Sequence, residues 1–117
     1  MQLNLDDVPV INNEKARRFE ATVDGQRALI TYRISQAKIF FDHTEVPEPF
    51  EGQGLAAKLT RVAFDFARTN HLSVVPLCPY VTAYIRKHAE VQDLVSPDDL
   101  RRILSPSEGQ KSPAPGK

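Results

Sequence analysis

The feature that most constrains this fold is a change of hydrophobic period on either side of a glycine loop. Before the loop, residues 18–34 alternate apolar and polar side chains with the period of two that is typical of half-buried strands. After it, from Leu55 to Phe66, apolar residues recur at the spacing of one face of an amphipathic helix. Gly52 and Gly54 separate the two patterns. The chain is therefore expected to fold as strands followed by a helix that packs on them.

The region before the loop predicts an antiparallel meander of three strands. A tight turn at Asp24-Gly25 joins the first two, because glycine accepts a positive φ without strain. A second turn is expected at Ser35-Gln36. The third strand has Ile39, Phe40 and Phe41 in a row, as in a strand covered on both faces. The three strands are predicted at residues 18–23, 27–34 and 37–46, the last ending at Pro47 and Pro49.

Beyond the first helix, residues 72–77 form a short apolar run that predicts a buried strand. A helix separates it from the strand at 37–46, so the two are expected to be parallel neighbours joined by a right-handed crossover. A second helix is predicted at residues 80–88, after Cys78-Pro79, and a third begins with Ser96 as its N-cap. The predicted fold class is α+β (α/β), an antiparallel β-meander plus a parallel β-α-β crossover with helices packed on the sheet.

A chain of 117 residues has the length of one domain. We place that domain at residues 1–104. The last 13 residues contain three Pro, three Ser and two Gly and lack any aliphatic residue larger than Ala114. Such a segment cannot repay the entropy of ordering, so residues 105–117 are expected to be a disordered tail.

Charge and composition argue against several classes of partner. The 15 Lys and Arg are matched by 15 Asp and Glu, and this balance does not favour nucleic acid. No apolar run reaches the ~20 residues of a membrane helix, and the N-terminal sequence lacks the pattern of a signal peptide, so we expect no membrane partner and a cytoplasmic protein. The single Cys and the wide spacing of the three His match no metal site.

The strand, glycine loop and helix together make an arrangement suited to a phosphate group. The first N–H groups of a helix lack intrahelical partners and point toward a region of positive potential. A pyrophosphate fits such a site, although a Gly-x-Gly segment is also common as a plain turn. The loop is not a Walker loop, since no Gly-Lys-Ser/Thr follows, and it lacks the third glycine of the dinucleotide fingerprint.

Residues 52–56, Gly-Gln-Gly-Leu-Ala, resemble the acetyl-CoA loop of the GNAT acetyltransferase superfamily, whose pattern is Gln/Arg-x-x-Gly-x-Gly/Ala. Gly54 and Ala56 match this pattern, and Glu51 stands where Gln or Arg is expected. From about Val10 to Val95, the chain is similar to the compact YjdJ-type branch of that superfamily. The segments that carry this likeness are residues 18–20, Tyr32, residues 43–47, 51–56 and 78–81, and Tyr84-Ile85 ahead of His88.

The resemblance implies an acetyl-CoA-dependent N-acetyltransferase that transfers acetyl to an amine of unknown identity. Coenzyme A would lie between the strands at 37–46 and 72–77, with its pyrophosphate on the amides of the glycine loop. Backbone amides of residues 44–46 would donate to the thioester carbonyl. The implied cofactor-binding residues are Thr44, Glu45, Val46, Gly52, Gln53, Gly54, Leu55 and Ala56.

Three side chains, those of His43, Cys78 and Tyr84, are candidates for catalysis, and Glu45 is an alternative to the first of them. His43 is the candidate base, since imidazole exchanges protons near neutral pH, and Glu45 is a second possible base. Cys78, the expected N-cap of the second helix, is a candidate nucleophile for the acetyl group, or an acid and positioning group in direct transfer. The resemblance implies Tyr84 as the candidate proton donor to the departing thiolate, because many members of the superfamily place a tyrosine on the corresponding helix. Each of the three also fits a purely structural role in the core or at a strand end.

Two other functions are compatible with the sequence. One is a coenzyme-A-binding or regulatory module without transfer activity, because so short a chain leaves little surface for an acceptor pocket. The other is an interaction domain in which the glycine loop is only a turn. The sequence specifies neither the acceptor nor the oligomeric state.

Overall fold

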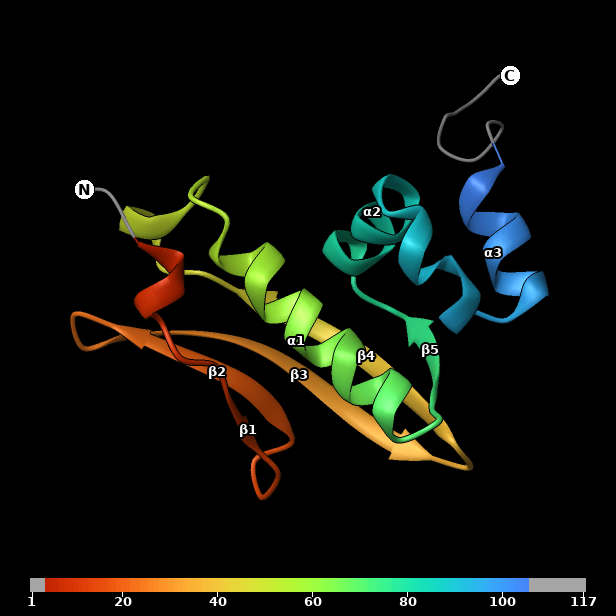
Figure 1. Ribbon diagram of the computed structural model, residues 1–117, viewed down its shortest axis with the longest axis horizontal. Coiled ribbons are helices and arrows are strands. Elements are labelled where there is room, and N and C mark those ends of the chain that lie inside the picture. The colour runs from red at the N-terminus through yellow and green to blue at the C-terminus, as the bar shows by residue number, and fades with distance from the viewer. Residues whose placement is uncertain (1–3, 106–117) are drawn as a thin grey trace.

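The computed structural model describes residues 4–105 (Figure 1). The predicted tail therefore lies outside the described residues from position 106 onward, and the domain boundary stays a prediction. The strands are β1 (Ile11–Asn13), β2 (Arg18–Val23), β3 (Gln26–Ser35), β4 (Lys38–Glu45) and β5 (Ser73–Pro76). The helices are α1 (Leu55–Thr69), α2 (Pro79–Lys87) and α3 (Pro97–Leu104), with 3₁₀ turns η1 (Leu5–Asp7), η2 (Glu48–Phe50) and η3 (Ala89–Leu94).

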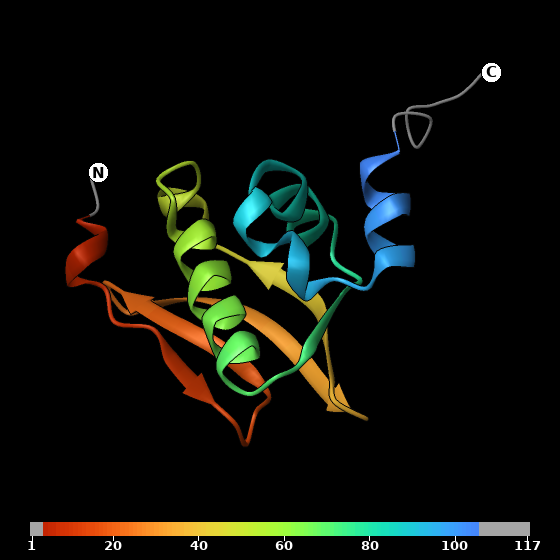
Figure 2. The same ribbon diagram turned by 45° about the vertical axis from the view of Figure 1, so that its right-hand side comes forward.

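The five strands form one sheet in the order β1-β2-β3-β4-β5. Strands β1 to β4 are antiparallel neighbours, whereas β5 pairs with β4 in parallel through the crossover helix α1. Figure 2 shows α1 passing in front of the sheet and leading into β5 at its edge. The predicted fold class, an antiparallel meander plus a parallel β-α-β crossover, is confirmed.

The hairpin turns explain the strand boundaries. Asp24 and Gly25 both have positive φ, 51° and 76°, as a two-residue hairpin turn requires. The second turn lies one residue later than predicted, because Gln36 and Ala37 adopt φ values of 53° and 65°. The short strand β1 was not predicted, since its three residues show no alternation of apolar side chains.

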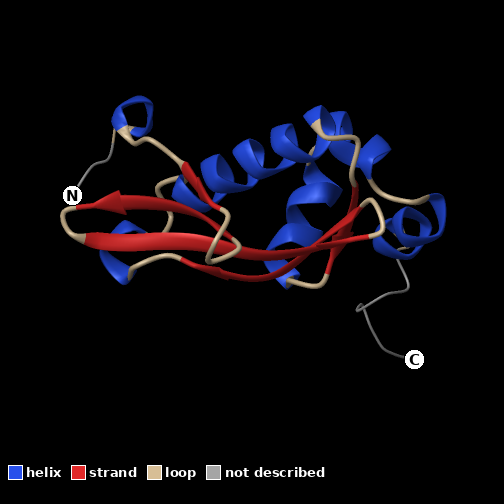
Figure 3. Cartoon of the chain, turned by 90° about the horizontal axis from the view of Figure 1, so that it is seen from below, coloured by secondary structure: helices blue, strands red, loops and turns tan. Residues whose placement is uncertain are grey.

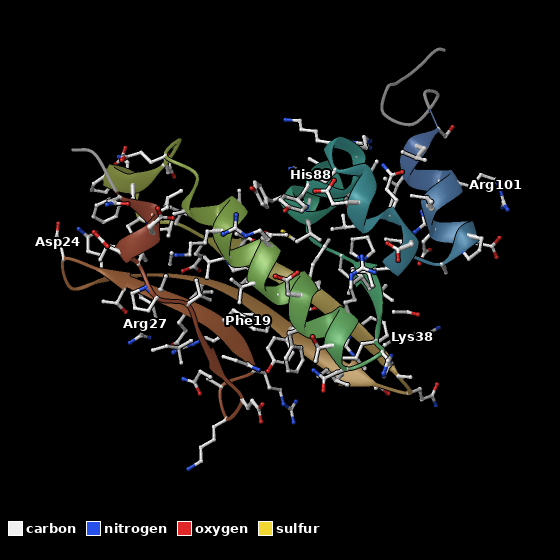
Figure 4. The ribbon with its side chains drawn as sticks, in the orientation of Figure 1. Phe19, Asp24, Arg27, Lys38, His88 and Arg101 are labelled. Carbon is white, nitrogen blue, oxygen red and sulfur yellow. The ribbon has the colours of Figure 1, made fainter. Side chains whose placement is uncertain are left out.

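Helix α1 covers one face of the sheet, as the view in Figure 3 shows. Phe19 lies beneath this helix in Figure 4, and its ring is 5.6 Å from that of Phe66. The buried face of α1 is wider than the predicted stripe, because Phe64 is fully buried as well. Its ring packs against Phe41 of β4 on one side and Tyr84 of α2 on the other, at centroid distances of 5.5 and 5.6 Å. The helix thus joins the sheet to α2.

The opposite face of the sheet is less covered than predicted. Ile39 and Phe41 of β4 are buried, but Phe40 between them is only half-buried, so the expectation of a strand covered on both faces is wrong. The Arg33 guanidinium lies 4.6 Å from the centre of the Phe40 ring. We call the side away from α1, with Thr31, Arg33 and Phe40, the free face of the sheet.

Two interactions hold the segment after α2, and the sequence predicted the first of them, the N-cap of α3. Ser96 is the N-cap of α3, and its Oγ accepts a hydrogen bond from the Asp99 amide at 3.2 Å. Arg68 of α1 donates to both carboxylate oxygens of Asp93 at 2.8 and 3.0 Å, and to the Glu90 carbonyl at 3.0 Å. This bidentate pair ties α1 to η3.

Candidate coenzyme site

Strands β4 and β5 separate at one end of the sheet. Their ladder ends at the pair Phe41–Pro76, and the Leu77 amide donates to the Phe41 carbonyl at 3.0 Å. Beyond this point β4 continues to Glu45, whereas the chain after β5 turns toward α2, as Figures 1 and 2 show. The last residues of β4 therefore have no strand partner on that edge among the described residues.

A β-bulge lies at the point of separation. Tyr32 pairs with Phe41 and Thr31 with His43, which leaves Asp42 without an opposite residue on β3. One inserted residue reverses the face on which each later side chain lies. Thr44, opposite the fully buried Ile30, therefore faces α1, and His43, opposite Thr31, lies on the free face.

The bulge also reorients the backbone of β4. Before it, Phe41 directs its carbonyl toward β5. Since residues along a strand alternate in the edge to which they bond, a one-residue insertion makes Thr44 and Val46 the residues that direct backbone groups toward the open edge. An extended ligand beside β4 would meet those groups as a neighbouring strand does.

A cavity of about 340 Å³ adjoins this edge. It brings together six of the residues that the sequence assigned to cofactor binding, from β4, the glycine loop and the first turn of α1. Glu45 is not among its lining residues, and neither is Gln53, whose Nε2 donates to the Pro49 carbonyl at 3.2 Å. The lining residues are Thr44, Val46, Phe50, Glu51, Gly52, Gly54, Leu55, Ala56, Ala57 and Tyr80.

The start of α1 is open to this cavity. Gly54 is the N-cap with φ 88° and ψ 4°, a left-handed conformation that favours glycine, and no side chain caps the helix. The first intrahelical hydrogen bond runs from the Lys58 amide to the Gly54 carbonyl at 3.0 Å, so the amides of residues 55–57 lack intrahelical acceptors. Within residues 4–105, no other group accepts from these three amides. Residues 55–57 all line the cavity, and Leu55 is the most buried of them, at 1% exposed.

The other side of the loop is closed by η1. Leu5 packs so near Gly54 that a Cβ there would lie 3.0 Å from the Leu5 Cδ1. The Lys58 ammonium holds η1 in place by donating to the carbonyls of Leu5 and Val8. Glu51, on the cavity wall, is exposed and adds a negative charge where the related pattern has Gln or Arg.

Cys78 lies at the start of α2, where the sequence placed it. It is the N-cap, with Pro79 at the first helical position, and it is 5% exposed. Its Sγ lies 3.3 Å from the Thr44 Oγ1, across the gap between the two separating strands. Thr44 thus contacts both the cavity and the sulfur.

The structure places the other two catalytic candidates apart from this pair. The His43 Nε2 lies 2.9 Å from the Glu45 Oε2 on the free face, where both side chains are more than half exposed. Tyr84 stacks on His88 at 3.9 Å and faces α1 rather than the cavity wall. Burial raises the pKa of Tyr84, and the nearby Glu90 adds to this effect.

The cavity instead receives Tyr80, which sequence reasoning missed. Tyr80 lies in the first turn of α2 and is 36% exposed. Burial, with a smaller effect from Tyr84, raises the pKa of Tyr80, so its hydroxyl stays protonated at neutral pH and can donate a hydrogen bond. The available signal was its position two residues after Cys78 at the end of the separating strand.

No group of three or more His, Cys, Asp or Glu side chains among the described residues could hold a metal ion. None of the helices in the described part of the chain is long and apolar enough to cross a bilayer.

A strand that separates from its parallel neighbour, a glycine loop and a helix with an open N-terminus define the GNAT class of fold. A solved structure supports this assignment: the solution NMR structure of a GCN5-like protein from Staphylococcus aureus superposes with a TM-score of 0.62 and 28% sequence identity. The match covers 75% of this chain and 87% of that one.

Sequence comparison defines the family within this class. The family described as GCN5-related N-acetyl-transferase matches residues 18–94, and the chain belongs to that family. Among its relatives, Protein NATD1 of Xenopus tropicalis is 30% identical over 84 residues, which cover 69% of this chain and 77% of the frog protein. Protein NATD1 of Danio rerio is 27% identical over 110 residues, covering 88% and 94% of the two chains.

Proposed function

We propose that this protein binds acetyl-CoA and transfers the acetyl group to an amine. The observation that carries the proposal is the set of open amides at residues 55–57, which border the same cavity as the free edge of β4. Three N–H groups at a helix N-terminus favour two linked phosphates. The pantetheine arm of the coenzyme would then run along β4 toward Cys78.

Membership of the family supports the use of acetyl-CoA, and the geometry suggests how the chain would hold it. The pyrophosphate would accept hydrogen bonds from the amides that open α1. The backbone groups of Thr44 and Val46 would pair with the amides of the pantetheine arm, as in strand addition. The same edge of β4 would offer a donor to the thioester carbonyl as negative charge develops on its oxygen.

The chemistry needs a base for the amine and a donor for the departing thiolate. We assign the base to His43, with Glu45 beside it, on the free face. The acceptor would then approach from that side while the coenzyme lies on the side of α1. Tyr80 is the better placed donor to the thiolate, since it lines the cavity and Tyr84 does not. Cys78 would act next to the thioester, as nucleophile or as positioning group.

Calorimetric titration with coenzyme A and turnover of acetyl-CoA with a panel of amines test this proposal together. We expect binding with a dissociation constant between about 1 µM and 1 mM, a range common for enzyme substrates. Turnover should fall at least about 100-fold in Cys78→Ala, whereas the affinity for coenzyme A should change little. Absence of binding at millimolar coenzyme would reject the proposal, and binding without turnover would favour a coenzyme-A-binding module.

A further inference from the structure

We propose that Thr44 is a positioning residue for the Cys78 sulfur, acting through its side-chain hydroxyl. The inference rests on the proposed function, because it gives the Cys78 sulfur a purpose beside a thioester. It goes beyond the backbone role of Thr44 along the open edge of β4.

The first argument is geometric. The Thr44 Oγ1 and the Cys78 Sγ are 3.3 Å apart, within hydrogen-bond distance for sulfur. Neither atom has another hydrogen-bond partner within residues 4–105. Thr44 lines the cavity, whereas Cys78 is 5% exposed and is not among the lining residues. The hydroxyl is therefore the polar group that connects the sulfur to the proposed thioester position.

The second argument is topological. Thr44 reaches Cys78 only because the bulge at Asp42 shifts the side chains of β4 by one position. With a regular ladder Thr44 would lie on the free face, away from α2. The bulge, which lies where β4 separates from β5, thus also places the Thr44 hydroxyl beside the Cys78 sulfur.

The third argument concerns the protonation of the sulfur. A hydroxyl carries one donor hydrogen and two lone pairs, and its hydrogen rotates freely. Thr44 can accept from the S–H group and, once the proton has left, can donate to the thiolate. A carbonyl oxygen, by contrast, could accept from the thiol but could not pair with the thiolate. A hydrogen bond donated to the thiolate would stabilise it. The thiolate is the reactive form of cysteine, so the Thr44 hydroxyl would favour the reactive form.

Three variants separate the hydroxyl from the shape of the side chain. Thr44→Val keeps the branched shape and removes the hydroxyl, and Thr44→Ser keeps the hydroxyl and removes the methyl. Thr22→Val is the matched control, because it makes the same change at an exposed position of β2. Thr44→Ala replaces Thr44→Val if valine is not tolerated.

The experiment follows modification of Cys78 by methyl methanethiosulfonate, a small thiol reagent, in the full chain at neutral pH without coenzyme. The chain has one cysteine, so mass spectrometry reports this site alone. We expect Thr44→Val to slow the reaction about ten-fold, as loss of one hydrogen bond to a charged group predicts. Thr44→Ser and Thr22→Val should stay within about two-fold of the original rate.

Other outcomes would overturn the inference. Equal rates in Thr44→Val and the original protein would mean that the hydroxyl does not act on the sulfur. A faster reaction in Thr44→Val would mean that Thr44 only shields the Cys78 sulfur from the reagent. If Thr44→Ser reacts as slowly as Thr44→Val, the effect belongs to the shape of the threonine side chain and not to its hydroxyl. Because these rates are measured without coenzyme, they stand even if calorimetry finds no coenzyme binding, which would reject the proposed function alone.

Discussion

His43 and Thr44 are consecutive residues of β4 whose side chains lie on opposite faces of the sheet. His43 is opposite Thr31 on the free face, and Thr44 is opposite Ile30 on the face that α1 covers. The bulge at Asp42 determines which residue lies on which face, and it divides the site into a proposed coenzyme side and a proposed acceptor side. The division makes the roles of the two sides separable by mutation.

Removing the imidazole should affect turnover and leave coenzyme binding intact. His43 is not among the residues that line the cavity, so His43→Ala should leave the affinity for coenzyme A within about two-fold. Loss of a general base typically lowers the rate by about 10²- to 10⁴-fold. Steady-state kinetics with a responsive amine, alongside calorimetry, measures both. A loss of coenzyme affinity equal to the loss of turnover would contradict the division of the site.

Two glycines with similar backbones form a matched pair for the loop. Gly54 and Gly25 have φ values of 88° and 76°, so an alanine at either position costs about 1 kcal/mol of folding stability through strain. Of these two glycines, Gly54 borders the cavity and Gly25 does not. We expect Gly54→Ala to weaken coenzyme binding at least about ten-fold, since a Cβ there alters the loop that offers the amides.

Gly25→Ala should bind coenzyme A normally and lower the melting temperature less than Gly54→Ala, because a Cβ at Gly25 meets nothing within 4 Å whereas one at Gly54 lies 3.0 Å from the Leu5 Cδ1. Thermal melts and calorimetry on both variants provide the comparison. Equal coenzyme affinities would show that the glycine loop serves only as a turn.

The two tyrosines of α2 should differ in their effect on turnover. Burial raises the pKa of both, so both hydroxyls are protonated at neutral pH. Tyr80 lines the cavity and Tyr84 packs between Phe64 and His88. Tyr80→Phe should therefore lower kcat by about ten-fold or more, and Tyr84→Phe by less than about three-fold. The reverse order would return the role of thiolate donor to Tyr84.

The ion pair between Arg68 of α1 and Asp93 of η3 predicts a contribution to folding stability that is lost in acid. The hydrogen bonds from Arg68 hold the pKa of Asp93 below its ordinary value of 3.8. Because the pKa of Asp93 is lower in the folded state, the unfolded chain binds more protons. The contribution to stability is therefore fully present above the ordinary pKa of the carboxyl group and is lost as the pH falls through the folded-state pKa. Both side chains are substantially exposed, which keeps the effect small.

Asp93→Asn should remove this contribution and make the loss of stability between about pH 5 and about pH 2 less steep. Urea unfolding across that range measures the slope. Adding Arg68→Gln to Asp93→Asn should cause no further change in the slope. If Asp93→Asn has the same slope of unfolding free energy against pH as the original protein, the Arg68–Asp93 pair does not contribute to the pH dependence of stability.

Much of this architecture could be predicted from the sequence because local patterns determine it. Alternation of apolar residues predicted β2 within its observed bounds, and the run from Leu55 predicted α1. The bulge could not be predicted, since Asp42 looks like an ordinary polar strand residue and its position depends on where β4 leaves β5. The face assigned to each later side chain depends on that bulge, and so does the contact of Thr44 with Cys78.

The burial of Phe64 was missed for a related reason. Its burial depends on α2 packing beside α1, which is a contact between elements distant in sequence. The candidate site follows the same rule. The order of elements along the chain was enough to predict the glycine loop and Cys78 as candidate site residues, whereas the position of Tyr80 in the cavity wall and the separation of His43 from Cys78 required the tertiary structure.

The central claim, that the open amides of α1 receive the pyrophosphate of coenzyme A, is tested most directly by NMR. A titration of the ¹⁵N-labelled full chain with coenzyme A should shift the amide signals of residues 54–57 furthest and those of Thr44 and Val46 by smaller amounts. Dephospho-coenzyme A, which retains the pyrophosphate, should shift the same signals. Saturating coenzyme A that leaves the amides of residues 54–57 unmoved would contradict the account.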